Sequence, residues 1–219
     1  MDKEQAASQQ EQAGIAVILA SASPRRKELL ERAGVKFSIV VCETDESIDE
    51  ELYAQPEEAA KKIAEKKAGA VIQQLLACEQ VETTVVIGAD TMVVFEGTVF
   101  GKPRNLSDGT HMLKTLSGNN HEVITAVSVW MVSAGEDEKV NLGFRTFADS
   151  ARVTFKELDD EQIAEYLRQG ESFDKAGAYA AQGKGAELIE KIEGDIDTVI
   201  GLPVTKLVTE FPDLVTNAE

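Results

Sequence analysis

The sequence is poor in the residues that build disulfide frameworks, zinc sites and histidine-based catalytic centres. Its 219 residues include two cysteines, Cys42 and Cys78, and two histidines, His111 and His121. The cysteines lack metal-ligand spacing and a secretory context, which disfavours structural zinc and disulfides. Neither histidine has a visible catalytic partner in the sequence, so a Ser-His-Asp or Cys-His mechanism has little support.

Long apolar runs are missing as well. No stretch approaches the roughly 18 consecutive apolar residues that a membrane-spanning helix needs. Residues 1–14 are rich in Gln, Glu and Ala and resemble neither a signal peptide nor a transit peptide. We expect 1–14 to be a disordered tail and 15–219 to form a single domain. A reducing, cytoplasmic location without a membrane partner is the corresponding expectation.

Positive charge is scarce, because 22 Lys and Arg residues stand against 39 Asp and Glu residues and the net charge is −17. Such a surface repels polyanions, so nucleic acid is not an expected partner. A phosphate-bearing ligand would need a concentrated basic pocket, helped by a divalent cation.

The clearest positive signal is the segment 20–26, which reads Ala-Ser-Ala-Ser-Pro-Arg-Arg after the apolar run 15–19. The run predicts a buried strand. Ser23 as N-cap and Pro24 at the first helical position predict a helix that ends before Gly34.

Arg25 and Arg26 then fall in the first helical turn, where each cation opposes the helix dipole by roughly 0.3 to 1 kcal/mol. Their presence indicates an anion such as phosphate bound at that end. Pairing of both arginines with surface carboxylates is an equally good explanation from this segment alone.

The rest of the chain alternates strands with helices, which predicts an α/β fold around a mixed sheet. Strands are expected at 37–41, 84–87, 92–95, 98–100, 121–132 and 143–155, the last two as a hairpin. Helices are expected to begin at Pro56, Ser107 and Asp159. Glycines punctuate the last fifty residues and predict loops around a site, without a P-loop or dinucleotide fingerprint.

The long helix from Pro56 has an expected apolar stripe and an expected solvated side. The stripe comprises Ala59, Ile63, Ala70 and 75–77. The solvated side comprises Lys61, Lys62, Glu65 and Lys66, whereas Lys67 fits either side.

Two carboxylates and three lysines are candidate site residues. Asp90 follows an apolar strand, where open α/β sheets present ligands, and it would hold a metal or activate water, or merely cap a turn. Glu46, in the acidic loop 43–51, would be a second site carboxylate or a solvated acid. Lys67, Lys102 and Lys175 stand at loop or strand boundaries, and each alone is weak evidence because most lysines are at the surface.

Seven short motifs together resemble one family. They are the segment 20–26, Gly-Ala-Asp-Thr at 88–91, Lys-Pro at 102–103, Leu-Ser-Gly at 116–118 with His121, Asp-Lys-Ala-Gly-Ala-Tyr at 174–179, Gln-Gly at 182–183 and Val-Ile-Gly-Leu-Pro at 199–203. They occur in the order found in Maf proteins, which are nucleoside triphosphate pyrophosphatases, and the match runs from about residue 17 to 211.

The resemblance implies an elongated mixed sheet flanked by helices, with the nucleotide in a central cleft between two lobes. It implies hydrolysis between the α and β phosphates with Mg²⁺ or Mn²⁺, giving a nucleoside monophosphate and pyrophosphate. It also implies a homodimer. The alternative is a non-catalytic nucleotide-binding regulator of cell division and septum formation, to which the family has also been linked.

Matched motif by motif, the resemblance assigns roles to individual residues. Asp90 is the general base or metal-binding acid, and Glu46 is a second catalytic and metal-binding acid. The implied substrate-binding residues are Ser21, Ser23, Arg25, Arg26, Lys67, Thr91, Lys102, Asp174, Lys175 and Gln182.

The residues Arg25, Thr91 and Gln182 resemble the branch of the family that acts on dTTP and UTP. A glutamine amide accepts from N3–H and donates to O4 of uracil or thymine. A glutamate, which the 7-methyl-GTP branch typically has there, lacks the donor.

Overall fold

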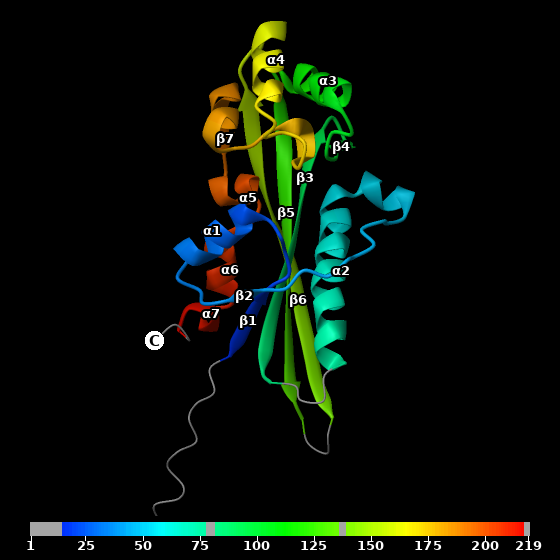
Figure 1. Cartoon of the computed structure of the whole chain (residues 1–219), viewed down its shortest axis with the longest axis vertical. Helices are drawn as coiled ribbons and strands as arrows, with labels where there is room; N and C mark the ends of the chain where they lie inside the picture. The colour runs from blue at the N-terminus through cyan, green and yellow to red at the C-terminus, as the bar shows by residue number, and fades with distance from the viewer. Residues whose placement is uncertain (1–14, 78–81, 136–138, 217–219) are drawn as a thin grey trace, which may run out of the picture.

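The computed structural model describes residues 15–77, 82–135 and 139–216 (Figure 1). The tail expected at 1–14 lies outside them. The sheet contains β1 (Ala16–Leu19), β2 (Ser38–Ile39), β3 (Thr84–Phe95), β4 (Thr98–Phe100), β5 (Asn120–Ala134), β6 (Val140–Phe155) and β7 (Ile189–Glu193). The α-helices are α1 (Pro24–Arg32), α2 (Pro56–Leu76), α3 (Leu106–Leu116), α4 (Asp160–Arg168), α5 (Ile196–Ile200), α6 (Val204–Glu210) and α7 (Asp213–Thr216). The 3₁₀ helices among the described residues are η1 (Glu50–Ala54), η3 (Ala176–Ala178) and η4 (Gly183–Leu188).

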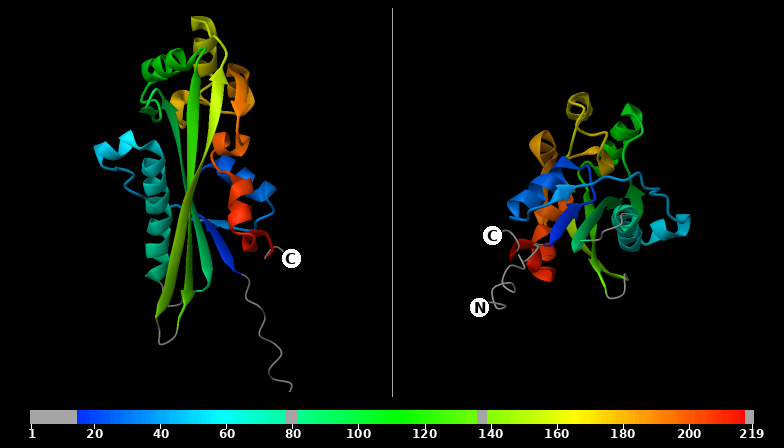
Figure 2. Two further views of the ribbon diagram at one scale, coloured as in Figure 1. Left: turned by 180° about the vertical axis from the view of Figure 1, so that it is seen from behind. Right: turned by 60° about the horizontal axis from the view of Figure 1, so that its bottom comes forward.

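The described strands form one mixed sheet in the order β2-β1-β3-β5-β6-β7, with β4 added beside β3. The strand β1 is parallel to β2 and β3, and the remaining pairs are antiparallel. The helix α2 covers one face, and α1 with α5 and α6 covers the other (Figure 2). The expected fold class, an elongated mixed sheet flanked by helices, is confirmed.

Local sequence rules explain the start of α1 well. Ser23 has an extended backbone, and its side chain accepts a hydrogen bond from the backbone N–H of Arg26 at 3.5 Å. Pro24 occupies the first turn, as predicted. The first turn contains no acidic residue, so both arginines stand at the positive end of the helix dipole.

Gly88 lets α2 approach β3 closely. A Cβ atom at Gly88 would lie 2.5 Å from the carbonyl oxygen of Ala64 and 2.8 Å from the backbone nitrogen of Ala68. Any larger residue would push the helix away from the strand. This close contact fixes the position along β3 at which the Lys67 side chain of α2 faces the strand.

Several sequence predictions are wrong in detail. The strand β2 covers two residues instead of 37–41, and β3 is continuous instead of ending at residue 87. The buried face of α2 consists of Ala59, Ala60, Ile63, Ala64, Ala68, Val71 and Ile72. Ala70 and Leu75 of the predicted stripe are half-buried, and Leu76 and Ala77 are exposed, because the 3.6-residue period rotates them away from the sheet.

Candidate functional site

A gap in the sheet creates the site. On one side of β3, β1 pairs with residues 84–87 and β4 pairs with residues 93–95. Residues 88–92 lie between these two partners and face the end of β1. Asp90 is therefore in the middle of β3, and the prediction that it lies at a strand end is wrong. It nevertheless lies beyond the carboxyl end of the parallel strand β1, which is where α/β sheets bind ligands.

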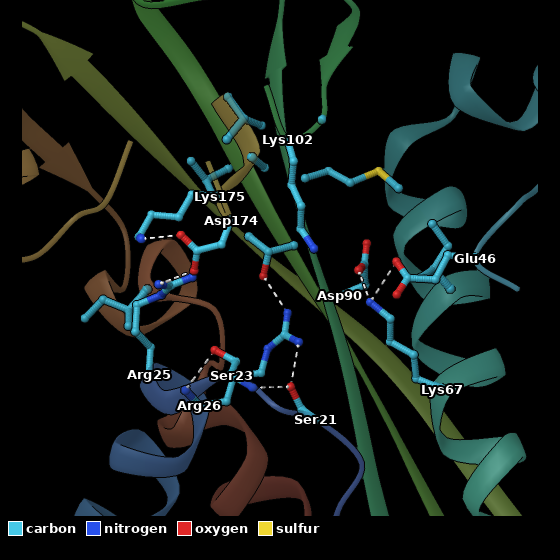
Figure 3. Close-up of a pocket in the computed structure, with 18 of the residues that line it drawn as sticks. Ser21, Ser23, Arg25, Arg26, Glu46, Lys67, Asp90, Lys102, Asp174 and Lys175 are labelled. Carbon is cyan, nitrogen blue, oxygen red and sulfur yellow. Dashed lines mark hydrogen bonds and ion pairs between the residues drawn. The ribbon is translucent and has the colours of Figure 1, made fainter. Parts of the chain in front are cut away.

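A cavity of about 610 Å³ occupies this gap (Figure 3). Its walls carry five cations and three carboxylates, a net charge of +2, although the whole chain carries −17. The cations are Arg25, Arg26, Lys67, Lys102 and Lys175, and the carboxylates are Glu46, Asp90 and Asp174. A basic cavity inside an acidic protein concentrates an anionic ligand at this one place.

Lys67 joins the two predicted acids. Its Nζ lies 2.7 Å from Oδ1 of Asp90 and 3.2 Å from Oε2 of Glu46 (Figure 3). The Asp90 and Lys67 side chains are 13% and 16% exposed, whereas Glu46 is 51% exposed. The inner carboxylate is thus nearly enclosed, and the outer one stands at the mouth of the cavity.

Lys66 holds the loop that carries Glu46. Its Nζ donates to the backbone carbonyl groups of Asp45 at 3.3 Å and Ser47 at 2.6 Å, the two neighbours of Glu46. Lys66 lies on the expected solvated side of α2, and there it also holds this loop. Adjacent lysines of α2 fix the backbone and the carboxylate of the same loop.

Arg26 is anchored through all three guanidinium nitrogens. Nε donates to the carbonyl oxygen of Gly201 at 2.8 Å, Nη1 to Oγ of Ser21 at 3.2 Å, and Nη2 to Oγ1 of Thr91 at 3.2 Å. Loss of hydration lowers the pKa of Arg26, while the charge of Asp90 acts in the opposite direction. A guanidinium has five N–H donors, so two remain for a ligand.

Arg25 and Lys175 share the carboxylate of Asp174. Nη1 of Arg25 lies 3.4 Å from Oδ2, and Nζ of Lys175 lies 2.6 Å from Oδ1. Partial burial would raise the pKa of Asp174, but the hydrogen bond from Lys175 and the charges of both cations outweigh it and hold the pKa below its ordinary value. Asp174 thus keeps two cations in place on the wall opposite Asp90.

Lys102 extends into the cavity towards Asp90 (Figure 3). The ammonium group has no hydrogen bond or ion pair with any described residue. Among the cavity cations it is therefore the most available for an incoming anion.

Eleven of the twelve predicted site residues line the cavity, and Gln182 is the exception. It is half-buried at the start of η4, next to Ala181, which does line the wall. Sequence reasoning missed three supporting residues, Lys66, Thr125 and Gly201. Only Gly201, within a family motif, carried a signal that would have located it.

The two carboxylates fit a magnesium-type cation. Asp90 and Glu46 supply hard oxygen donors that converge on one point, the Nζ of Lys67. Across the described ranges, no group of three or more metal-ligating side chains occurs. Mg²⁺ commonly uses one or two carboxylates together with substrate phosphates and water, which suits such a sparse donor set.

Fold and cavity together define an α/β protein with a basic cleft that suits an anionic ligand. Within the part of the chain that the structure describes, no helix has the length and apolar character needed to cross a bilayer.

The chain belongs to the Maf-like protein family, whose model matches residues 16–214. It is similar to the dTTP/UTP pyrophosphatase of Bacillus velezensis, with 46% identity over 87% of this chain and 92% of the relative. The dTTP/UTP pyrophosphatase of Bacillus cereus is 43% identical over 89% of this chain and 88% of the relative. Among solved structures, the Ham1 protein of Staphylococcus aureus aligns over 90% of this chain and 98% of its own, with a TM-score of 0.44 and 11% identity.

Proposed function

We propose that the protein hydrolyses nucleoside triphosphates, with dTTP and UTP as preferred substrates, to a nucleoside monophosphate and pyrophosphate. The observation that carries the proposal is the cavity with a net charge of +2 in a chain of −17, arranged around Asp90 and Glu46. Relatives named dTTP/UTP pyrophosphatases, 43–46% identical over most of both chains, support the same activity.

The cations of the cavity bind and orient the triphosphate. Attack of water on phosphorus breaks the α–β anhydride bond, and charge spreads over the phosphate oxygens on the way. Arg26 and Lys102 present unused N–H donors to those oxygens. Because the groups are held in place before the substrate arrives, little reorganisation is needed during the reaction.

Asp90 receives the proton of the attacking water. Its Oδ1 accepts from Lys67, and no described residue donates to Oδ2, which is left for the water. The oxygen of the water forms the new bond to phosphorus, its proton passes to the carboxylate, and pyrophosphate departs with the electrons of the broken P–O bond.

Asp90 and Glu46 would hold a divalent cation, Mg²⁺ or Mn²⁺. The chemistry that such a cation would supply is neutralisation of the negative charge on the phosphate oxygens. Chelation should therefore abolish turnover, and added Mg²⁺ or Mn²⁺ should restore it in a pyrophosphate-release assay.

Base selectivity tests the choice of dTTP and UTP. A mispaired buried polar group costs roughly 1 to 3 kcal/mol, about ten- to hundredfold in kcat/KM, so CTP, GTP and ATP should be poorer substrates. The measurement is kcat/KM for the five nucleotides. A preference for purine triphosphates would contradict the proposed substrate class.

The base-reading role of Gln182 stays a prediction, since the residue does not line the cavity. Gln182→Glu should lower kcat/KM for dTTP and UTP and flatten the ranking, because the donor to O4 is lost. Lys184→Gln, at an exposed position of the same loop, is the control. An unchanged ranking in Gln182→Glu would show that another group reads the base.

A non-catalytic regulator of cell division would need the same cavity, but it has little use for a water-activating acid. Steady-state pyrophosphate release separates the two functions. The homodimer and the cytoplasmic location also stay predictions, and sedimentation of the purified protein and cell fractionation test them.

A further inference from the structure

A chain of hydroxyl groups runs from the cavity into the protein interior. Thr91 of β3 lies directly opposite Thr125 of β5, and their Oγ1 atoms are 2.9 Å apart. Oγ1 of Thr125 donates to the backbone carbonyl of Thr198 in α5 at 2.7 Å. Thr125 is completely buried and is not part of the cavity wall.

The direction of every hydrogen bond in this chain is fixed. A carbonyl oxygen only accepts, so the single proton of the Thr125 hydroxyl points to Thr198. Thr125 must then accept from Thr91, which uses the only proton of the Thr91 hydroxyl. Thr91 is left as an acceptor towards the cavity, and Arg26 donates to it at 3.2 Å.

This direction suits the guanidinium of Arg26. If the Thr91 proton pointed to the cavity, it would face Nη2 of Arg26, and two donors would repel each other. Thr125 prevents this orientation although it lies behind Thr91 and touches no ligand. The hydrogen bond from Thr125 also gives the carbonyl oxygen of Thr198 a partner. Thr198 belongs to α5, a five-residue helix whose last carbonyl groups lack partners within the helix.

We propose that Thr125 is a positioning residue for the triphosphate-binding Arg26, acting through Thr91. The proposal rests on the proposed function for its effect on catalysis. The simpler explanation, that Thr125 only joins β5 to α5, predicts an effect on stability without an effect on the phosphate site.

The decisive variants remove or keep one hydroxyl. Thr125→Val has nearly the same shape and should lower kcat/KM for dTTP about tenfold, on the scale expected for a misplaced binding group. Thr125→Ser keeps the hydroxyl and should restore most of the activity. Thr146→Val is the matched control, because Thr146 lies in the same sheet and bonds Ser128 and Glu65 away from the cavity.

Two further readouts separate positioning from packing. The ratio of kcat/KM for dTTP to that for UTP should stay unchanged in Thr125→Val, since Arg26 contacts phosphate and not the base. The losses in kcat/KM caused by Thr91→Val and Thr125→Val should not multiply in the double variant, because both substitutions break the same chain of hydroxyl groups. If Thr125→Val does not fold, Thr125→Ala is measured well below its melting temperature.

Calorimetric titration with inorganic tripolyphosphate tests the inference apart from catalysis. The Kd of Thr125→Val should be several-fold above that of the wild type, whereas Thr146→Val should match the wild type. A wild-type protein that binds tripolyphosphate without hydrolysing any nucleotide would contradict the proposed function alone. Three results would each overturn the role of Thr125. They are a wild-type Kd in Thr125→Val, losses in kcat/KM that multiply in the Thr91→Val, Thr125→Val double variant, and a Thr125→Ser variant as inactive as Thr125→Val.

Discussion

Asp90 and Thr91 are neighbours in β3 that serve opposite sides of the cleft. Successive side chains of a strand point to opposite faces, so Asp90 reaches Lys67 on α2 while Thr91 reaches Arg26 on α1. Both can take part in one site because β3 has no strand partner beside them on the edge that faces the end of β1. The gap in the sheet therefore lets side chains from both faces of the sheet line the same cavity.

His121 provides a residue-scale prediction about pH. It is buried against Phe155, and Nε2 lies 2.7 Å from the hydroxyl of Tyr179, a cavity wall residue. Burial lowers the pKa of His121 from 6.5 to about 4, and burial also raises the pKa of Tyr179. Between pH 6.5 and 4 the unfolded chain therefore binds a proton that the folded protein does not.

The stability that neutral His121 contributes is complete above pH 6.5 and is lost as the pH falls towards 4. A shift of this size corresponds to about 3 kcal/mol in the free energy of unfolding. In denaturant titrations, His121→Gln should show a weaker pH dependence across this interval than the wild type. His111→Gln, on the exposed side of α3, is the control and should follow the wild type. Equal pH dependence in His121→Gln would contradict this account of the residue.

At the scale of elements, α2 and the loop before it act together. Lys66→Met keeps the apolar stem but loses both bonds to the carbonyl groups beside Glu46, so the carboxylate should be held less well. We expect kcat/KM to fall about three- to tenfold, about 1 kcal/mol.

The matched control is Lys62→Met, one turn earlier on α2, where the side chain is exposed and pairs loosely with Glu65 at 3.6 Å. It should keep wild-type kcat/KM. Combining Lys66→Met with Glu46→Gln should add little further loss, because both changes act on one carboxylate. Equal activity of the Lys66 and Lys62 variants would exclude a role for the loop contact.

Elements with strong local signals were predictable from the sequence. The N-cap and proline of α1, the β5–β6 hairpin and the start of a helix at Asp159 follow local sequence rules, and the structure confirms them. The short helices α5 to α7 and the strand β7 were missed, since segments of four to seven residues depend on tertiary packing.

The residues that line the cavity were predictable from the sequence with the exception of Gln182, but their geometry was not. Family motifs located the cavity residues, yet Asp90 was expected at a strand end, because sequence shows where β1 stops but not that β3 continues past it. Lys66 and Thr125 act through a backbone carbonyl or another hydroxyl. Such contacts leave no pattern along the chain.

At the scale of the whole molecule, charge is distributed unevenly. Because the whole chain has a net charge of −17, most of its surface should repel polyanions such as nucleic acid. The cavity has a net charge of +2 and suits a small anion. Two lobes contribute lining residues to the cavity: Lys102 follows β4 in the lobe with α3 and α4, and Arg25 and Lys67 lie on α1 and α2 in the lobe with β1. Figure 1 shows how these elements are arranged. Both lobes supply cations to the cavity, so binding of the triphosphate should connect them.

The most direct test of the central claim is identification of the products formed from dTTP by the wild type and by Asp90→Asn. The wild type should yield dTMP and pyrophosphate in equal amounts. Asp90→Asn keeps the shape of the side chain but loses its charge, and the rate should fall on the order of a hundredfold or more while the melting temperature changes little. Formation of dTDP and inorganic phosphate, or full activity in Asp90→Asn, would contradict the claim.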